Sequence, residues 1–388
     1  MHALFRHAGD ILSSYTGEIP LHHSLKAHFR QFPILGSRDR KCISALVYSH
    51  YRCAGVFDED TDERKRWWAA MILSDQPKAW IGLLFPEFPA PPERGDWLER
   101  SQFLKEQGIS HQPEAILTNL PEFSETIQPE VYLKAFYSQP GLFIKASTSA
   151  LGRIQKALNK QGIAYTDHGQ SCLELPLNTP LQQWLKPADF RVQDRASQAV
   201  YQHFPNIQPK LIWDVCAGAG GKTLLLRERY AQADLMASDV RETALANLRQ
   251  RFMQYGYAPP WMAVYDAASG EQPSFIDEKQ QPDFIVCDVP CSGSGTWHRN
   301  PEQRFFFKPE SLESFSERQF QIATSAAKAL APGGYLLYVT CSVFKAENEG
   351  VVERLLSNTA LTLDHQQAIS WLHAGGDCLF VTRFRNEA

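Results

Sequence analysis

The sequence is organised around residues 211–222, which read L-I-W-D-V-C-A-G-A-G-G-K. The opening run is apolar except for Asp214, as is typical of a buried parallel strand. Gly218, Gly220 and Gly221 follow, and a helical pattern begins directly after them. A strand, a glycine turn and a helix predict the first βα unit of a doubly wound sheet, a place where backbone N–H groups can meet a ligand. The glycines alone are a weak signal, because any tight βα loop also needs glycine.

Two later stretches strengthen this interpretation. Residues 283–297 read D-F-I-V-C-D-V-P-C-S-G-S-G-T-W, and residues 334–343 read G-Y-L-L-Y-V-T-C-S-V. Each is an apolar strand followed by a cysteine, Cys291 or Cys341. Because ligands bind at the carboxyl ends of the strands in an open α/β sheet, we expect the glycine loop and both thiols to converge there.

Together these stretches resemble the Sun/Fmu (RsmB-type) family of RNA cytosine-5 methyltransferases. The resemblance rests on D-V-C-A-G-A-G-G-K at 214–222, D-V-P-C-S-G-S-G at 288–295, T-C-S-V at 340–343 and V-Q-D-R-A-S at 192–197. It implies a Rossmann-like S-adenosylmethionine-dependent methyltransferase domain, preceded by a small α/β module like an RNA-recognition motif. It covers about the last two hundred residues well and the first half loosely.

Composition limits the class of protein. The chain has 388 residues, 44% hydrophobic and 12% aromatic, which is typical of a globular protein with two or three domains. A net charge of −4 gives no overall basic field, so any RNA binding must use local patches. Eight cysteines without C-x-x-C pairs predict neither a zinc site nor a disulfide framework. With no signal sequence and no apolar run long enough to span a bilayer, we expect a reduced cytoplasmic protein, without metal and not bound to a membrane.

The pattern predicts three parts. Residues 1–120 are expected to be a helical region, possibly RNA-binding, 121–188 a small α/β module, and 189–388 the Rossmann-like domain. In the first part, the basic and aromatic run 64–68 is either a helix with its tryptophans in the core or an RNA-binding patch. In the second part, four cations either line an RNA-binding face or form the polar face of an exposed helix: Lys145, Arg153, Lys156 and Lys160.

The last part alternates strands with helices, which predicts a mostly parallel sheet covered on both faces. Helices are expected at 241–255 and 310–330, and the final strand is expected to be an antiparallel edge. The predicted strands are 211–215, 235–238, 261–265, 284–287, 335–339 and 378–384.

Three aspartates follow these strands. Asp239 ends the second strand, where a carboxylate can bind ribose hydroxyls, or can instead cap the next helix. Asp266 ends the third strand, where it can reach an adenine amino group or can cap the next helix. Asp288 ends the fourth strand and can accept a hydrogen bond from the amino group of a methionine moiety. By resemblance these aspartates form the S-adenosylmethionine site together with Cys216, Ala217, Gly218, Ala219, Gly220, Gly221 and Lys222. Binding of NAD or NADP by the same loop is disfavoured, since G-x-G-x-x-G is absent.

The two thiols indicate the chemistry. Carbon 5 of cytosine is a poor nucleophile, and a thiolate that adds to carbon 6 activates it; a second group then assists proton loss and release. The resemblance assigns Cys341 as the nucleophile and Cys291 as the release residue. The alternative is that both cysteines pack as small apolar side chains, which is what we expect of Cys42, Cys53 and Cys172. The loop after Cys291 carries Trp, His and Arg, which can clasp a flipped base.

The sequence therefore predicts a monomeric S-adenosylmethionine-dependent RNA (cytosine-5) methyltransferase that acts on ribosomal RNA through a covalent cysteine–cytosine adduct. The alternatives are a tRNA methyltransferase and a catalytically silent RNA-binding assembly factor. An adenine or protein methyltransferase is disfavoured, because those reactions need no thiol.

Overall fold

The computed structural model describes residues 2–92, 95–177, 179–271, 273–276 and 280–387, and its chain forms two compact units. Unit 1 comprises residues 1–120, 128–140 and 296–309, and unit 2 comprises 121–127, 141–295 and 310–388. The expected boundaries at residues 120 and 188 stay a prediction. None of the helices in the described ranges is both long and apolar enough to cross a membrane.

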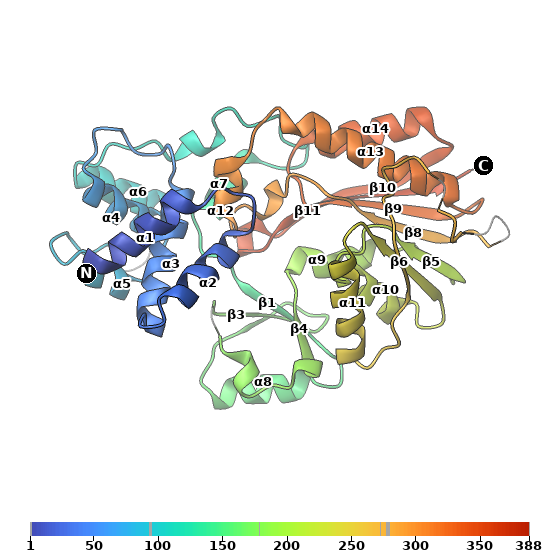
Figure 1. Cartoon of the computed structure of the whole chain (residues 1–388), viewed down its shortest axis with the longest axis horizontal. Coiled ribbons are helices and arrows are strands. Elements are labelled where there is room, and N and C mark those ends of the chain that lie inside the picture. The colour runs from blue at the N-terminus through green and yellow to red at the C-terminus, as the bar shows by residue number, and fades with distance from the viewer. Residues whose placement is uncertain (1, 93–94, 178, 272, 277–279, 388) are drawn as a thin grey trace. The chain divides into compact units, whose positions relative to one another are not determined.

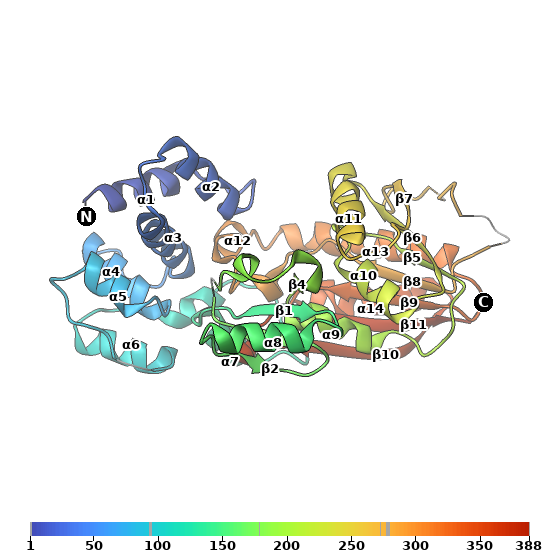
Figure 2. The same cartoon turned by 90° about the horizontal axis from the view of Figure 1, so that it is seen from below.

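Unit 1 is helical, which confirms the helical N-terminal region. Asp62 and Asp96 start two of its helices by accepting backbone N–H bonds of the first turn. The first three helices pack together (Figure 2) around the buried face of the third, which includes Ile43 and Leu46. The helices are α1 (His2–Ser14), α2 (Leu21–Gln31), α3 (Ser37–Arg52), α4 (Glu63–Leu73), α5 (Lys78–Leu84), α6 (Trp97–Glu106), α7 (Pro129–Phe136) and α12 (Pro301–Phe306).

Unit 2 contains a four-stranded antiparallel sheet in the order β2-β3-β1-β4. Its strands are β1 (Leu142–Ala146), β2 (Thr166–Asp167), β3 (Cys172–Leu175) and β4 (Phe190–Val192). Helix α8 (Leu151–Lys160) buries Ile154 and Leu158 in the same cluster as Ile144 and Leu173 of the sheet. This sheet therefore has an apolar core of its own.

The second sheet of unit 2 has seven strands in the order β10-β11-β9-β8-β5-β6-β7 (Figure 1). The strands β5, β6, β7, β8 and β9 are parallel, whereas β10 and β11 are antiparallel. They span β5 (Leu211–Asp214), β6 (Asp234–Asp239), β7 (Trp261–Val264), β8 (Phe284–Asp288), β9 (Tyr335–Thr340), β10 (Leu361–Ser370) and β11 (Cys378–Asn386). This arrangement confirms the predicted Rossmann-like sheet.

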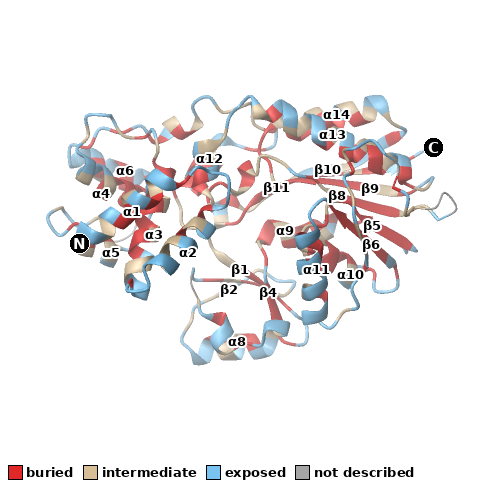
Figure 3. Cartoon of the chain, in the orientation of Figure 1, coloured by how far each residue is buried: buried red, intermediate tan, exposed pale blue. Residues whose placement is uncertain are grey.

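Helices cover both faces of this sheet, because its interior strands carry apolar side chains on both faces. Figure 3 shows these strands as buried. Ile212 and Val286 pack against α10 (Gly221–Arg229) and α11 (Glu242–Gln254) on one face. Trp213 and Ile285 pack on the other face, against α13 (Ser311–Ala329) and α14 (Glu349–Asn358). A short helix, α9 (Arg195–Ala199), adds to the first face.

One expectation for this sheet is wrong. The final strand, β11, is antiparallel as predicted, but it is not the edge, since β10 pairs with its outer side. Strand β10 reads L-T-L-D-H-Q-Q-A-I-S and is mostly exposed, so it lacks the apolar pattern that marks a strand. Strand β11 is almost wholly buried, as an interior strand should be.

Candidate active site

The glycine loop follows β5 and is tied to neighbouring elements of unit 2. Gly218 and Gly220 have φ of +53° and +82°, values that favour glycine, and α10 begins at Gly221. A side chain on Gly220 would lie 2.8 Å from Leu248 of α11. Arg251 Nη1 donates to the Ala219 carbonyl at 2.9 Å. The loop is thus fixed against α11, whereas a side chain on Gly218 or Gly221 would meet only the tip of Arg241 or of Gln193, each 3.9 Å away.

Asp239 ends β6, and its carboxylate holds the same loop. Oδ2 accepts the N–H of Gly218 at 2.9 Å, and Oδ1 accepts the N–H of Arg241 at 2.9 Å and its Nε at 3.1 Å. Burial alone would raise the pKa of Asp239, but the bonds from Arg241 and Gly218 outweigh it and lower the pKa. The helix-cap alternative is wrong, because the N-cap residue of α11 is Arg241, two positions after Asp239. Asp239 is a carboxylate beside the glycine loop.

The other two predicted aspartates already have partners. Asp288 ends β8 and forms an ion pair with Lys222 of the glycine loop, 2.6 Å apart. Asp266 lies two residues beyond β7, where it accepts the N–H of Ala268 at 3.1 Å and pairs with Arg318 at 3.2 Å. Asp266 is half-exposed and is thus the most peripheral of the predicted cofactor residues.

Acidic groups gather where β5 ends. Burial and the charges of Asp214, Asp288 and Asp239 raise the pKa of Cys216, which therefore stays a thiol. Asp214 is fully buried; its Oδ2 accepts the hydroxyl of Thr223 at 2.6 Å, and its Oδ1 has no hydrogen-bond partner among the described residues. Burial raises the pKa of Asp214 to about 7. The structure thus brings Cys216, Asp239 and Asp288 together, as predicted.

The two thiols converge. Because β8 and β9 are parallel neighbours, Cys291 and Cys341 follow adjacent strand ends, and their Sγ atoms lie 3.2 Å apart. Gly295 ties the loop after Cys291 to the loop of Cys341, because its N–H donates to the Cys341 carbonyl at 2.9 Å. A side chain there would lie 2.1 Å from the Cys378 carbonyl. This spacing allows both sulfurs to act on one small ring.

A buried carboxylate, Glu347, joins the two cysteine loops. It accepts the N–H of Ser292 at 2.8 Å and the hydroxyls of Ser292 and Ser342, each at 2.5 Å. Gln319 of α13 donates to it at 2.8 Å. Ser292 follows Cys291 and Ser342 follows Cys341, so one side chain anchors both thiols. Glu347 is not among the predicted site residues, because nothing in its local sequence indicates that it is buried or that it contacts the two cysteine loops.

The charges around the two sulfurs differ. The hydrogen bond with Cys341, burial, and the charges of Cys341 and Glu347 raise the pKa of Cys291 well above its usual value. The ammonium of Lys222 interacts with Cys341 through its charge. Burial alone would lower the pKa of Lys222, but Asp288 and Cys341 outweigh it and raise the pKa, so the cation persists. Negative charge therefore faces Cys291 and positive charge faces Cys341.

Residues of the loop after Cys291 do not fit the predicted base clasp. Trp297 is fully buried in unit 1, with its ring 5.0 Å from that of Phe307. His298 is 2% exposed, and its carbonyl accepts a bond from Arg52 at 2.8 Å. Burial removes both side chains from contact with a base, so this expectation is wrong for Trp297 and His298, whereas Arg299 is half-buried.

Several of the cations predicted to bind RNA already contact other residues of the chain. Trp68 is buried and Arg64 pairs with Glu87 while lying over Phe5, which favours the packing account of residues 64–68. In the four-stranded module, Arg153 pairs with Asp189 at 3.0 Å. Lys145 lies over the ring of Tyr201, and Lys156 and Lys160 are exposed on α8.

The chain is similar in sequence to known methyltransferases. The family model described as 16S rRNA methyltransferase RsmB/F matches residues 205–374. Two relatives named "Ribosomal RNA small subunit methyltransferase B" are each 30% identical. The one from Vibrio cholerae aligns over 53% of this chain and 47% of its own, and the one from Xanthomonas campestris over 56% and 51%. The chain thus spans about half the length of the curated relatives it matches.

Solved structures resemble the fold. The crystal structure of PH0851 has a TM-score of 0.67 and 19% identity and covers 94% of each chain. NSun6 from Pyrococcus horikoshii, solved with SFG, has a TM-score of 0.57 and 14% identity, and covers 67% of this chain and 94% of its own. The seven-stranded sheet and these likenesses show a Rossmann-like methyltransferase fold. By the family model and the curated relatives, residues 205–374 are similar to the Sun/Fmu (RsmB-type) family.

Proposed function

We propose that the protein is an S-adenosylmethionine-dependent RNA (cytosine-5) methyltransferase that acts on ribosomal RNA. The observation that carries this proposal is the 3.2 Å approach of Cys291 and Cys341 beside the glycine loop. Similarity to the family model supports RNA as the substrate class, and the names of the curated relatives support ribosomal RNA. Such a substrate would place the protein in the cytoplasm, and a single chain holds every residue that the mechanism uses.

The paired thiols suit a covalent route. Cys341 Sγ adds to carbon 6 of the cytosine, forming an S–C bond and moving the electron pair of the ring double bond toward carbon 5. Carbon 5 thereby becomes nucleophilic enough to take a methyl group. Cys291, whose thiol has given its own proton to water, then accepts the proton from carbon 5; the double bond re-forms and the bond between Cys341 and carbon 6 breaks. The thiolate of Cys341 returns at the end of the cycle.

The surrounding charges support this division of roles. The Lys222 ammonium lies close enough to Cys341 for their charges to interact, and it would stabilise the attacking thiolate. The raised pKa of Cys291 makes its thiolate a strong base for the carbon 5 proton, once the thiol has passed its own proton to water. Glu347 holds both loops at this spacing through Ser292 and Ser342.

The residues around the glycine loop fit S-adenosylmethionine. When bound, the cofactor supplies an electrophilic methyl carbon on its sulfonium. Gly218 and Gly221 leave room for a close backbone approach, and Asp239 offers a carboxylate at the strand end where ribose hydroxyls are expected. A ribose there would take the bonds that exposed Arg241 now makes. Asp288 and Asp266 would serve the methionine amino group and the adenine.

The test is methyl transfer from labelled S-adenosylmethionine to ribosomal RNA, followed by bisulfite sequencing of the product. We expect new protected cytosines with the wild-type chain and with Cys172→Ser, a buried thiol of the four-stranded sheet. Cys341→Ser should give none. RNA that is bound but never methylated would instead favour the assembly factor, and label found only on tRNA would overturn the ribosomal assignment.

A further inference from the structure

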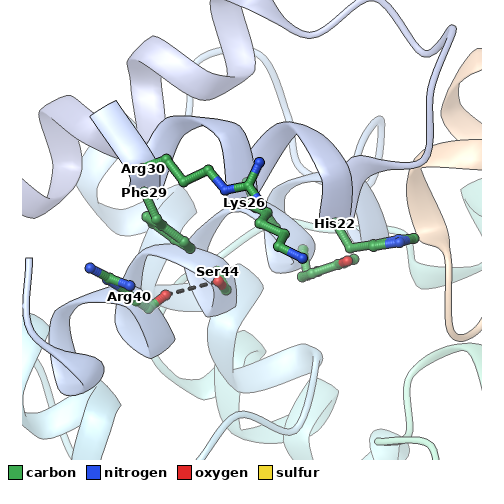
Figure 4. A pocket seen from close by; sticks show the side chains of 8 residues that line it. His22, Lys26, Phe29, Arg30, Arg40 and Ser44 are labelled. Atoms are coloured by element: carbon green, nitrogen blue, oxygen red, sulfur yellow. Dashed lines mark hydrogen bonds between the residues drawn. The ribbon is translucent and has the colours of Figure 1, made fainter. Parts of the chain in front are cut away.

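A groove runs between helices α2 and α3 of unit 1, outside the residues matched by the family model. Its volume is about 460 Å³. Lys26, Phe29 and Arg30 line it from α2, and Arg40 and Ser44 line it from α3 (Figure 4). The α2–α3 groove is completed by His22, Leu25 and Tyr48.

The groove is locally basic in a chain whose net charge is −4. Helix α2 has no Asp or Glu, and Lys26 and Arg30 are exposed on it. Residues 21–41 hold a single acid, Asp39, against five cations: Lys26, Arg30, Arg38, Arg40 and Lys41. A concentration of positive charge of this kind attracts phosphate even when the whole protein is acidic.

The acids near the groove are already bound. Asp39 accepts the N–H of Gly36 at 3.2 Å, at the start of α3. Glu302 is 2% exposed and accepts the N–H of Leu21. Burial, together with His23 and Lys26, lowers the pKa of His22, so that ring is neutral at pH 7. The positive charge that faces solvent thus belongs to Lys26, Arg30 and Arg40.

Aromatic side chains accompany the cations. Phe29 is half-buried, and the guanidinium of Arg40 lies 5.8 Å from the centre of its ring. Tyr48 forms part of the groove wall. Alternating cations and rings are the pattern by which proteins hold single-stranded nucleic acid, with phosphates on the cations and bases stacked on the rings.

We propose that the α2–α3 groove binds a single-stranded segment of the RNA substrate, with Lys26, Arg30 and Arg40 on its phosphates and Phe29 stacked against a base. The proposal rests on the proposed function for its choice of RNA. It adds a binding site in unit 1 that is separate from the residues of the reaction.

The test measures binding of the full chain to a fluorescent single-stranded oligouridylate across a range of salt concentrations. Lys26→Ala/Arg30→Ala should weaken binding about tenfold and reduce the slope of log K against log[salt] by about 1.4, at ~0.7 per phosphate contact. Phe29→Leu should weaken binding by at least about fivefold, as lost base stacking does, without changing the slope. Lys65→Ala/Lys134→Ala removes two exposed cations of the same unit and should change neither quantity.

Equal affinity and salt slope for Lys26→Ala/Arg30→Ala (the groove variant) and its control would overturn RNA binding at the α2–α3 groove and would leave the proposed function intact. Weaker binding of the groove variant to anionic lipid vesicles, with RNA binding unchanged, would also overturn it. Methylation by the wild-type chain is measured in parallel, so failure of the reaction itself is seen separately. A groove variant that binds RNA poorly yet retains full affinity for S-adenosylmethionine supports the proposal.

Discussion

The Sγ atoms of Cys291 and Cys341 lie 3.2 Å apart, although fifty positions of sequence separate them. The closeness follows from the parallel pairing of β8 with β9, which brings the ends of two distant strands together. Two cysteines packed merely as apolar side chains would not need a buried carboxylate to hold both of their loops. Glu347 does so here, through Ser292 and Ser342.

Glu347→Gln should make Cys291 react at lower pH. The negative charge of Glu347 raises the pKa of Cys291, so removing that charge lowers it. In a Cys341→Ser background, we expect the midpoint of Cys291 alkylation by iodoacetamide to fall by ~1 pH unit, a common size for the loss of one nearby charge. Glu349→Gln, a buried neighbour that binds Ser124, is the control and should leave the midpoint unchanged. An unchanged midpoint in Glu347→Gln would show that this charge does not act on Cys291.

Asp214→Asn should stabilise the protein increasingly as pH rises. The pKa of Asp214 is raised from 3.8 to about 7 in the folded chain, so the folded state binds the proton more tightly than the unfolded state. Stability is therefore lost as pH rises from about 4 to 7 and stays lost above that. Between pH 5 and 8 the free energy of unfolding of the wild type should fall by on the order of 2–3 kcal/mol relative to that of Asp214→Asn. Urea unfolding at both pH values measures this, and parallel stability profiles would contradict it.

Asp239→Ala should weaken binding of S-adenosylmethionine by about 1–3 kcal/mol, the range for a lost hydrogen bond to a charged group. Arg241→Ala should not weaken it, because Arg241 only occupies the carboxylate that the ribose would use. Isothermal titration calorimetry distinguishes the two variants. Unchanged affinity in a folded Asp239→Ala protein would remove Asp239 from the cofactor site.

Much of this arrangement was predictable from local sequence. Apolar runs ended by Asp214, Asp288 and Thr340 mark buried parallel strands, and residues that follow parallel strands meet at one sheet edge. The polar strand β10 was not predictable, since pairing with β11 rather than its own pattern makes it a strand. The position of Trp297 depends on packing within unit 1, which sequence spacing does not encode.

Glu347 illustrates the same limit within the site. In the sequence it is one of two acids beside Asn348, and nothing there indicates that it is fully buried. Its role depends on Ser292, fifty-five positions away in the sequence, and on Gln319 of α13. Contacts between distant segments of this kind become visible only in the folded chain.

The most direct test of the central claim is trapping of the RNA–protein adduct. Cys291→Ser keeps the nucleophile but lacks the release group, so it should accumulate an adduct stable to denaturing gel electrophoresis, and only when S-adenosylmethionine is present. Cys341→Ser should form neither adduct nor methylated cytosine, and Cys172→Ser should behave as wild type. An adduct in Cys341→Ser with an inactive Cys291→Ser would reverse the two roles. Full activity in both variants would contradict the covalent mechanism.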